Sequence, residues 1–157
     1  MAITKLKTYL DDNTIKYVSI IHSQAYTAQQ TAESAHVPGK EMAKTVMVKI
    51  NNELVMLVLP ASEKVDLDLV KGAFHTDSVQ LASEPEFKDR FPNCETGAMP
   101  PFGNLYGMPV YVEEALARNT DIAFNAGSHT ELIKLSWQDY NRLVKPKTVR
   151  ISRTYTS

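Results

Sequence analysis

The sequence lacks several features that would fix its class at once. It contains a single cysteine, Cys94, which excludes an internal disulfide framework. This cysteine and the four histidines form no CxxC or HxxxH spacing, so we expect no metal. Lys and Arg number 17 against 18 Asp and Glu, which gives a net charge of −1. This balance argues against broad, nonspecific binding of nucleic acid, which needs a basic face, but it allows a local pocket for one end of a nucleic acid.

Long apolar runs are missing as well. The N-terminus lacks the apolar core of a signal peptide, and no run approaches the length that spans a membrane. We therefore expect a cytoplasmic protein with no membrane partner. The sequence has no internal repeat, low-complexity segment or linker. Its length suits one domain, expected to cover residues 1–157, and a hydrophobic content of 43% can form a proper core.

The spacing of apolar residues predicts irregularly alternating helices and strands. Helices are expected over residues 3–10, 28–35, 66–74, from 83 toward 91, and 136–143. Strands are expected over residues 16–21, 43–50, 53–59, 79–81, 110–112, 121–124, 131–135 and 149–151, with a frayed tail over 152–157. Two hairpins, turning at residues 51–52 and 125–130, imply antiparallel pairing. We predict an α+β fold, a single domain with a mixed sheet and peripheral helices.

The helix over residues 28–35 is small and rich in alanine. Thr27 is its expected N-cap, and Gln30 completes a capping box. Nothing in this helix demands a function, so we expect it to serve packing.

Lys44 begins a strand face that is otherwise aliphatic. Alternation along the strand places it on one side with Val46, Val48 and Ile50, while Lys49 points to the other side. Two interpretations are open. The side chain snorkels to solvent at the strand end, or it sits at a pocket rim where partial burial makes its charge useful against an anionic or polarised group.

Glycine and proline are concentrated between Glu95 and Pro109, in a segment with few charges and no periodicity. Proline fixes φ, and glycine allows conformations and close approaches that a Cβ forbids. The segment is therefore a shaped loop. It serves either as a tight connection between strands or as a functional site.

A second polar loop runs from Asn125 to Thr130 and contains Gly127 and His129. His129 is a candidate acid, base or hydrogen-bonding group, or else an exposed hairpin histidine. A nucleophile pair of Cys94 with His129 is conceivable, although a lone cysteine is more often a small packed residue.

The segments 43–46, 97–112 and 124–131, with matching layout at 22–28 and 59–66, resemble the YbaK/EbsC family. The resemblance extends from about Tyr17 to Val144. This family comprises aminoacyl-tRNA deacylases related to the editing domain of prolyl-tRNA synthetase. It implies a single α+β domain on a strongly curved mixed sheet. It also implies hydrolysis, in trans and without metal or cofactor, of the ester that joins a wrong amino acid to tRNA. The expected partner is the acceptor end of an aminoacyl-tRNA.

The resemblance also implies site residues. Lys44 matches the family's lysine, Gly97 and Pro101 match its Gly-x-x-x-Pro element, and Gly127 matches the glycine of its second loop. With His129 added, the expected catalytic set is Lys44, Gly97 and His129, and backbone N–H groups at Gly97 and its neighbours are expected to face an oxyanion. The residues expected to bind substrate are Met99, Pro101, Phe102, Gly103, Asn125 and Gly127. Met99 and Phe102 are the candidates for sizing the amino-acid pocket.

Two other functions fit the same residues. The pocket can hold an aminoacyl-adenosine or nucleotide for regulation, without chemistry. The loops can instead contact a protein partner. Trp137 and Tyr140, three residues apart on the last helix, are expected in the core rather than as a platform for stacking bases.

Overall fold

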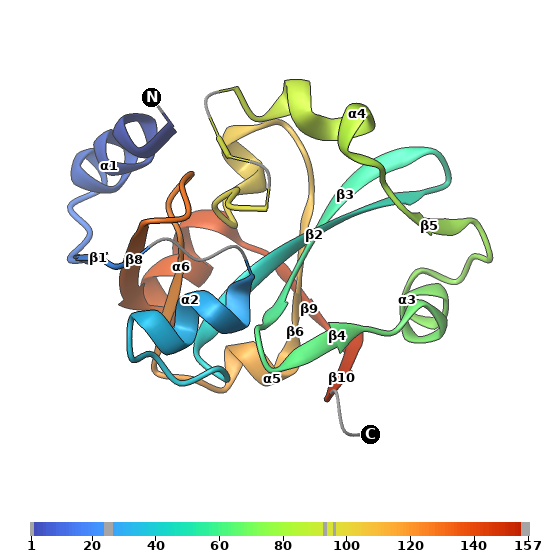
Figure 1. Ribbon diagram of the computed structural model, residues 1–157. Coiled ribbons are helices and arrows are strands. Elements are labelled where there is room, and N and C mark those ends of the chain that lie inside the picture. The colour runs from blue at the N-terminus through green and yellow to red at the C-terminus, as the bar shows by residue number, and fades with distance from the viewer. Residues whose placement is uncertain (1, 24–26, 93, 96, 155–157) are drawn as a thin grey trace.

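The computed structural model describes residues 2–23, 27–92, 94–95 and 97–154 (Figure 1). Its main sheet has eight strands in the order β1-β8-β7-β2-β3-β6-β9, with β5 also paired to β2, and β4 and β10 form a separate pair. The strands are β1 (Val18–Ile21), β2 (Met42–Ile50), β3 (Glu53–Pro60), β4 (Glu63–Val65), β5 (Val79–Leu81), β6 (Val110–Glu113), β7 (Asp121–Asn125), β8 (Glu131–Ser136), β9 (Lys147–Val149) and β10 (Ser152–Thr154). The helices are α1 (Ala2–Asp12), α2 (Ala28–Ser34), α3 (Leu67–Phe74), α4 (Glu84–Phe87), α5 (Glu114–Ala117) and α6 (Trp137–Val144).

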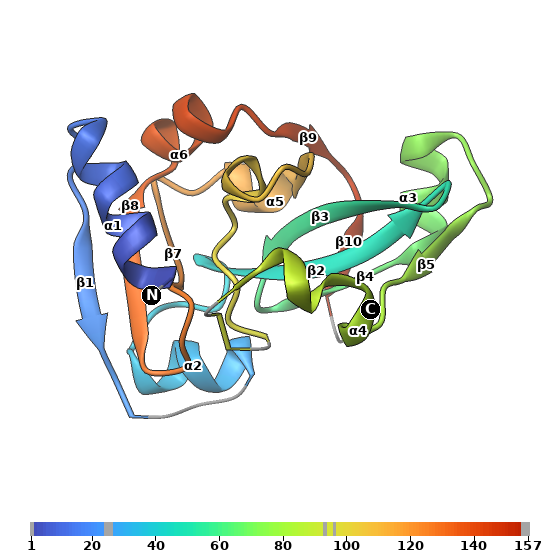
Figure 2. The same cartoon turned by 90° about the horizontal axis from the view of Figure 1, so that it is seen from above.

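The sheet is mixed, as predicted for an α+β fold. Strand β2 pairs antiparallel with β3 and β5 but parallel with β7, and β6 runs parallel to both β3 and β9. Figure 2 shows β7 and β8 running across the direction of β2 and β3, so the sheet bends strongly between them. Among the described residues, no helix is both long and apolar enough to cross a membrane.

Local sequence rules account for the predicted elements that the structure confirms. The β2–β3 hairpin turns at Asn51 and Asn52, whose φ values of 53° and 68° are tolerated by asparagine better than by most residues. Thr27 caps α2 by accepting from the backbone N–H of Gln30, and the Gln30 side chain completes the capping box. Ser83 and Glu86 form a second capping box at α4.

The alternation predicted for β2 is confirmed by the packing on its two faces. Ala43 and Met47 belong to the main core, while Val46, Val48 and Ile50 belong to a separate cluster beside α3. Met42, at the start of β2, lies on the same face as Val46 and packs under α2. Lys44 therefore lies on the α2 side of the sheet, and Lys49, on the other side, pairs with Glu86 at 2.6 Å.

The prediction of a frayed tail over residues 152–157 is wrong for residues 152–154. Ser152 to Thr154 form β10, paired with β4, and residues 155–157 lie outside the described residues. The cause is Glu113, which is 3% exposed and accepts hydrogen bonds from the backbone N–H groups of Ile151 and Ser152, both at 2.9 Å. A partner so distant in the sequence cannot be recognised from local pattern, and neither can the short β4. The strand predicted over residues 149–151 corresponds to β9, which covers Lys147–Val149 instead.

The segment β1–α2–β2 positions the site. Strand β1 is antiparallel to β8, β8 is antiparallel to β7, and β7 is parallel to β2, so β1, β7 and β2 all run the same way. Helix α2 carries the chain from the end of β1 back to the start of β2. Its buried Ala32 packs with Met42, Ala123 and Leu132 on one face of these strands.

Candidate active site

Polar side chains gather where β7 ends beside the beginning of β2. Bridging between β2 and β7 joins Met42 to Ala123 and Ala43 to Phe124. Because side chains alternate, Lys44 lies on the face of Met42, and Asn125 lies on the face of Ala123, one step beyond the last bridge on each strand. Lys44 is half-buried and Asn125 is 7% exposed. Lys44, near the amino end of β2, and Asn125, at the carboxyl end of β7, are therefore lateral neighbours on the side covered by α2.

The loop around Gly97 lies beside the same part of β2, toward the opposite face of the sheet. The Thr45 hydroxyl donates a hydrogen bond to the Met99 carbonyl at 3.3 Å. The backbone N–H of Gly127 donates to the Ala98 carbonyl at 2.9 Å, and the N–H of Glu95 donates to the Gly127 carbonyl at 2.8 Å. The two predicted loops are thus tied to each other. The second of these loops directly follows the carboxyl end of β7, and in open sheets with parallel strands ligands bind in the crevice outside the carboxyl ends.

Gly97 and His129 adjoin in this crevice. A Cβ built on Gly97 would lie 3.5 Å from Cε1 and 3.8 Å from Nε2 of the His129 ring. The φ of Gly97 is 85° and that of Gly127 is 99°, values that residues other than glycine rarely adopt. His129 is 5% exposed, whereas Gly97 is exposed. The loop therefore presents open backbone beside an otherwise covered imidazole ring.

Glu95 holds the His129 loop, and sequence analysis gave it no role. Its carboxylate Oε2 accepts a hydrogen bond from the backbone N–H of His129 at 3.2 Å and lies 3.9 Å from the ring Nε2. The carbonyl of Glu95 accepts from the N–H of Ala98 at 3.0 Å. The N–H of Ala98 is therefore already hydrogen-bonded within the loop. Of these two neighbouring residues, Gly97 is the one whose backbone N–H we propose to face a substrate.

Comparison with known proteins assigns this architecture. Residues 22–143 match the family model described as the aminoacyl-tRNA editing domain. The chain belongs to the aminoacyl-tRNA editing domain family. The matched range begins at His22 and ends within α6, so it includes Lys44, Gly97 and His129. The family is one of aminoacyl-tRNA deacylases, as the sequence resemblance predicted.

Individual relatives agree with this assignment. The Multifunctional Ser/Thr-tRNA deacylase ProXp-y of Escherichia coli (strain K12) is 31% identical over 117 residues, which cover 71% of this chain and 70% of the relative. The Proline--tRNA ligase of Bacillus cereus (strain AH187) is 24% identical over 89 residues, 57% of this chain and 16% of the ligase. A crystal structure proposed to be a trans-editing enzyme for prolyl-tRNA synthetase superposes with a TM-score of 0.81 at 15% identity, covering 97% of both chains. This last similarity confirms the fold.

The part of the Gly97 loop that includes Met99 and Phe102 packs into the core of this editing domain. Phe102 is 0% exposed and Met99 is 6% exposed. The Phe102 ring lies 5.3 Å from the rings of both Phe124 and Tyr140. These contacts assign Met99 and Phe102 to packing, and we therefore leave both out of the site proposed below, where they were expected to size the amino-acid pocket.

Pro101 and Gly103 are also fixed by structural contacts. The buried Tyr140 hydroxyl donates to the Pro101 carbonyl at 2.6 Å, and burial raises the pKa of Tyr140 so that the hydroxyl stays a donor. A Cβ on Gly103 would lie 2.6 Å from Cγ2 of Val110, so glycine is required for close approach to β6. Trp137 and Tyr140 pack together with ring centroids 5.4 Å apart, which confirms their predicted place in the core.

Cys94 has the surroundings of a packed residue rather than those of a nucleophile. It is half-buried against the main core, and its Sγ lies 3.9 Å from the Tyr106 hydroxyl. Burial raises the pKa of the Cys94 thiol. Reactive cysteines have the opposite shift, because the thiolate is the nucleophile.

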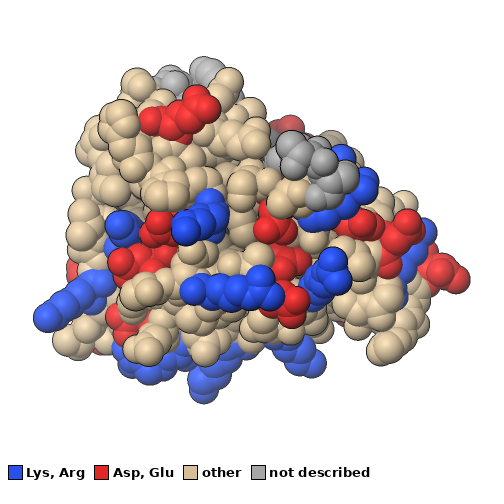
Figure 3. All heavy atoms as spheres, turned by 90° about the horizontal axis from the view of Figure 1, so that it is seen from below, with Lys and Arg blue, Asp and Glu red and all other residues tan. Residues whose placement is uncertain are grey.

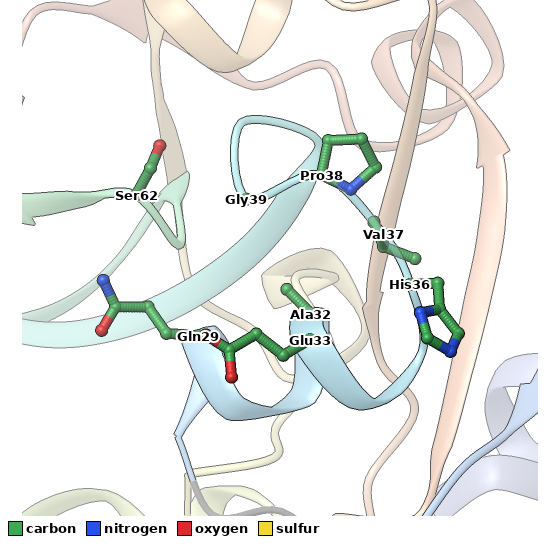
Figure 4. A pocket seen from close by; sticks show the side chains of 8 residues that line it. All are labelled: Gln29, Ala32, Glu33, His36, Val37, Pro38, Gly39 and Ser62. Carbon is green, nitrogen blue, oxygen red and sulfur yellow. The ribbon is translucent and has the colours of Figure 1, made fainter.

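A pocket of about 700 Å³ lies between α2, the turn that follows this helix, and Ser62. Figure 4 shows Gln29 and Glu33 extending from α2 on one side and Ser62 on the other. The described lining residues of this pocket include none of the predicted site residues, so it is a separate hollow along α2.

Proposed function

We propose that this editing domain is a trans-editing hydrolase that cleaves the ester bond between a wrong amino acid and its tRNA. The observation that carries the proposal is the adjacency of Gly97 and His129 beside the place where β7 ends next to β2, which also bears Lys44 and Asn125. These residue types supply what ester hydrolysis needs, namely an open backbone donor, a ring that can hydrogen-bond, and a positive charge.

The reaction is an addition followed by an elimination. The oxygen of a water molecule attacks the carbonyl carbon of the aminoacyl ester, and the carbonyl oxygen becomes an oxyanion. The bond from this carbon to the ribose oxygen then breaks, and the ribose oxygen takes up a proton that the attacking water gives up. The products are the free amino acid and a tRNA with a free terminal hydroxyl. No redox change or co-reactant is involved.

Each residue has a role that follows from its position. The backbone N–H of Gly97 faces the carbonyl oxygen, because no Cβ blocks approach there. His129 hydrogen-bonds the terminal ribose or the attacking water, and Glu95 positions it through the backbone bond at 3.2 Å. Lys44 places a positive charge where the terminal phosphate or the developing oxyanion lies. Asn125 and Gly127 shape the crevice between them.

The charge distribution favours recognition of the acceptor end rather than of the whole tRNA. Figure 3 shows Lys and Arg intermingled with Asp and Glu over the lower face of the molecule. Arg118, Arg150 and Arg153, for example, share one hollow with Glu63 and Glu114. Such a face does not supply the continuous basic surface on which long tracts of phosphate bind. We expect a small contact area and a shallow dependence of the rate on salt.

A panel of charged tRNAs tests the proposal. One tRNA transcript is charged separately with serine, threonine, alanine, cysteine, valine or proline, and release of the labelled amino acid is followed with and without protein. Serine and threonine are included because the Escherichia coli relative is named for them. Release of at least one amino acid above the rate in buffer is expected. If every amino acid stays attached, the hydrolase proposal is lost, and tight binding without release would indicate the regulatory module instead.

A further inference from the structure

Strand β1 forms one margin of the main sheet. It pairs with β8, and no second strand within the described residues pairs with it. Figure 2 shows it at the outer margin of the molecule, beside α1. Val18 and Ile21 on this strand are 58% and 73% exposed, and the strand reads Val-Ser-Ile-Ile, without a charge or a proline. An exposed apolar edge strand is a template for pairing with another chain.

The opposite margin of the same sheet is protected against such pairing. Strand β9 forms this margin, and it begins at Lys147, directly after Pro146. Arg150 follows the strand at its other end. Charged residues and prolines on edge strands discourage the association of sheets. Strand β1 has neither, so the two margins of the sheet differ in their capacity to bind another strand.

The register of β1 on β8 determines which backbone groups of β1 point outward. His22 donates its backbone N–H to the Thr130 carbonyl at 2.9 Å, in the register in which β1 and β8 are paired. In an antiparallel pair, every second residue exchanges hydrogen bonds with the neighbouring strand. Ile20 therefore directs its backbone groups toward β8, as His22 does. Ser19 and Ile21 direct their N–H and C=O groups away from β8, to the open side.

We propose that β1 pairs with β1 of a second copy of this chain, antiparallel across a two-fold axis at Ser19, and that the two main sheets thereby become one. Ser19 of each copy then exchanges both backbone hydrogen bonds with Ser19 of the other. Val18 lies opposite Ile20 of the second copy, and Ile21 lies opposite Tyr17, which directly precedes the strand. Both exposed aliphatic side chains gain an apolar cross-strand neighbour, and pairs of this kind stabilise sheets.

Charge and symmetry favour a second copy as the occupant. A stretch without charges pairs with its own equivalent without burying an unpaired charge. The nearest charge along the chain is Lys16, which is exposed. The antiparallel arrangement brings Lys16 to the end of the partner strand where Ile21 is bridged to Glu131, so opposite charges face each other and the two copies of Lys16 stay apart. A two-fold pair is also closed, because each copy uses the same edge.

Sedimentation velocity of the full chain tests the pairing. The apparent mass should rise from 17.6 kDa toward twice that value as the concentration is raised from about 2 μM to about 500 μM, since a small interface dissociates on dilution. Ile21→Lys places a charge on the open edge and should raise the dissociation constant at least about tenfold. Leu81→Lys is the matched control, because Leu81 is 58% exposed on β5, and it should leave the dissociation constant unchanged.

Two substitutions of Ser19 isolate the backbone hydrogen bonds. Ser19→Pro removes the outward N–H and leaves the bonds between β1 and β8 in place, because an edge strand tolerates proline where its N–H faces solvent. This variant should lose the dimer. Ser19→Ala loses the side-chain hydrogen bond to Glu131 at 2.6 Å but keeps the N–H, so it should keep the dimer. Thermal unfolding of each variant confirms that it is folded.

The outcomes decide the proposal without any tRNA substrate, so it stands or falls separately from the deacylase function. A mass that stays at 17.6 kDa up to the highest concentration overturns it. A dimer that survives Ile21→Lys also overturns it, and one that Leu81→Lys disrupts instead lies at β5. Loss of the dimer in Ile21→Lys and Ser19→Pro, with retention in Ser19→Ala and Leu81→Lys, is the result expected.

Discussion

Gly97 and His129 approach so closely that a Cβ on the glycine would lie 3.5 Å from the imidazole Cε1. They are brought together by hydrogen bonds between two loops, from Gly127 to Ala98 and from Glu95 to Gly127. The space beside the ring exists because residue 97 has no side chain. From this relationship we infer that the loop is part of the proposed site rather than only a connection, and the predictions below follow from that inference.

Gly97→Ala should impair both folding and activity. Alanine at a φ of 85° is strained, and we expect the free energy of unfolding to fall by about 1 kcal/mol or more. The new methyl also occupies the space beside His129, so kcat/KM should fall at least about tenfold. Urea unfolding and single-turnover release of the amino acid measure the two effects. Gly72→Ala is the control, since nothing lies within 4 Å of its Cβ on α3 and helix propensity favours alanine.

Tyr140→Phe should destabilise the protein through the Gly97 loop. It leaves the buried Pro101 carbonyl without the donor that lies 2.6 Å away. An unpaired buried acceptor costs about 1–3 kcal/mol, which denaturant unfolding resolves. Tyr9→Phe is the control, because its hydroxyl accepts a hydrogen bond from Asn104 at an exposed position. Equal stability of the two variants would show that Tyr140 does not anchor the loop.

Cys94→Ala should retain the deacylase activity. The thiol packs against the core, and burial raises its pKa, so it is mostly protonated at neutral pH and poorly nucleophilic. Alkylation of the native protein by iodoacetamide should accordingly be slower than that of the unfolded chain at the same pH. Loss of activity in Cys94→Ala, with the fold retained, would revive the cysteine–histidine mechanism.

Glu86 should make stability depend on pH in the acid range. The hydrogen bond from Lys49 and those from Ser83 lower the pKa of Glu86 to about 2. A carboxyl with a lowered pKa in the folded state stabilises the fold fully above its unfolded pKa of about 4.3, and this contribution is lost as the pH falls toward 2. The advantage of the wild type over Glu86→Gln in free energy of unfolding should therefore shrink across this window. An advantage that stays constant with pH would contradict the assignment.

Local sequence rules were sufficient for elements that are stabilised locally. The Asn51–Asn52 turn and the Thr27 cap depend on neighbouring residues, and both were predicted. The alternation in β2 also placed Lys44 and Lys49 on opposite faces. Strand β10 was missed because it depends on Glu113, whose partners lie far along the chain.

The site was predictable in its parts but not in its assembly. Lys44, Gly97 and His129 could be selected by residue type and family pattern. Their placement where β7 ends beside β2 depends on the parallel pairing of these strands, which joins segments far apart in sequence. Phe102 was a candidate for sizing the amino-acid pocket because it directly follows the segment Gly97 to Pro101 that matches the family's Gly-x-x-x-Pro element, yet three other rings pack around it.

The rate of amino-acid release by Lys44→Ala, compared with the wild type and with Lys49→Ala, tests the central claim most directly. The two lysines share β2 but lie on opposite faces, and Lys49 pairs with Glu86 near the other end of the strand. The account predicts that Lys44→Ala loses nearly all release from the best substrate of the tRNA panel, that Lys49→Ala keeps it, and that both variants remain folded. Equal rates for the two variants would contradict a site built around Lys44 where β7 ends beside β2.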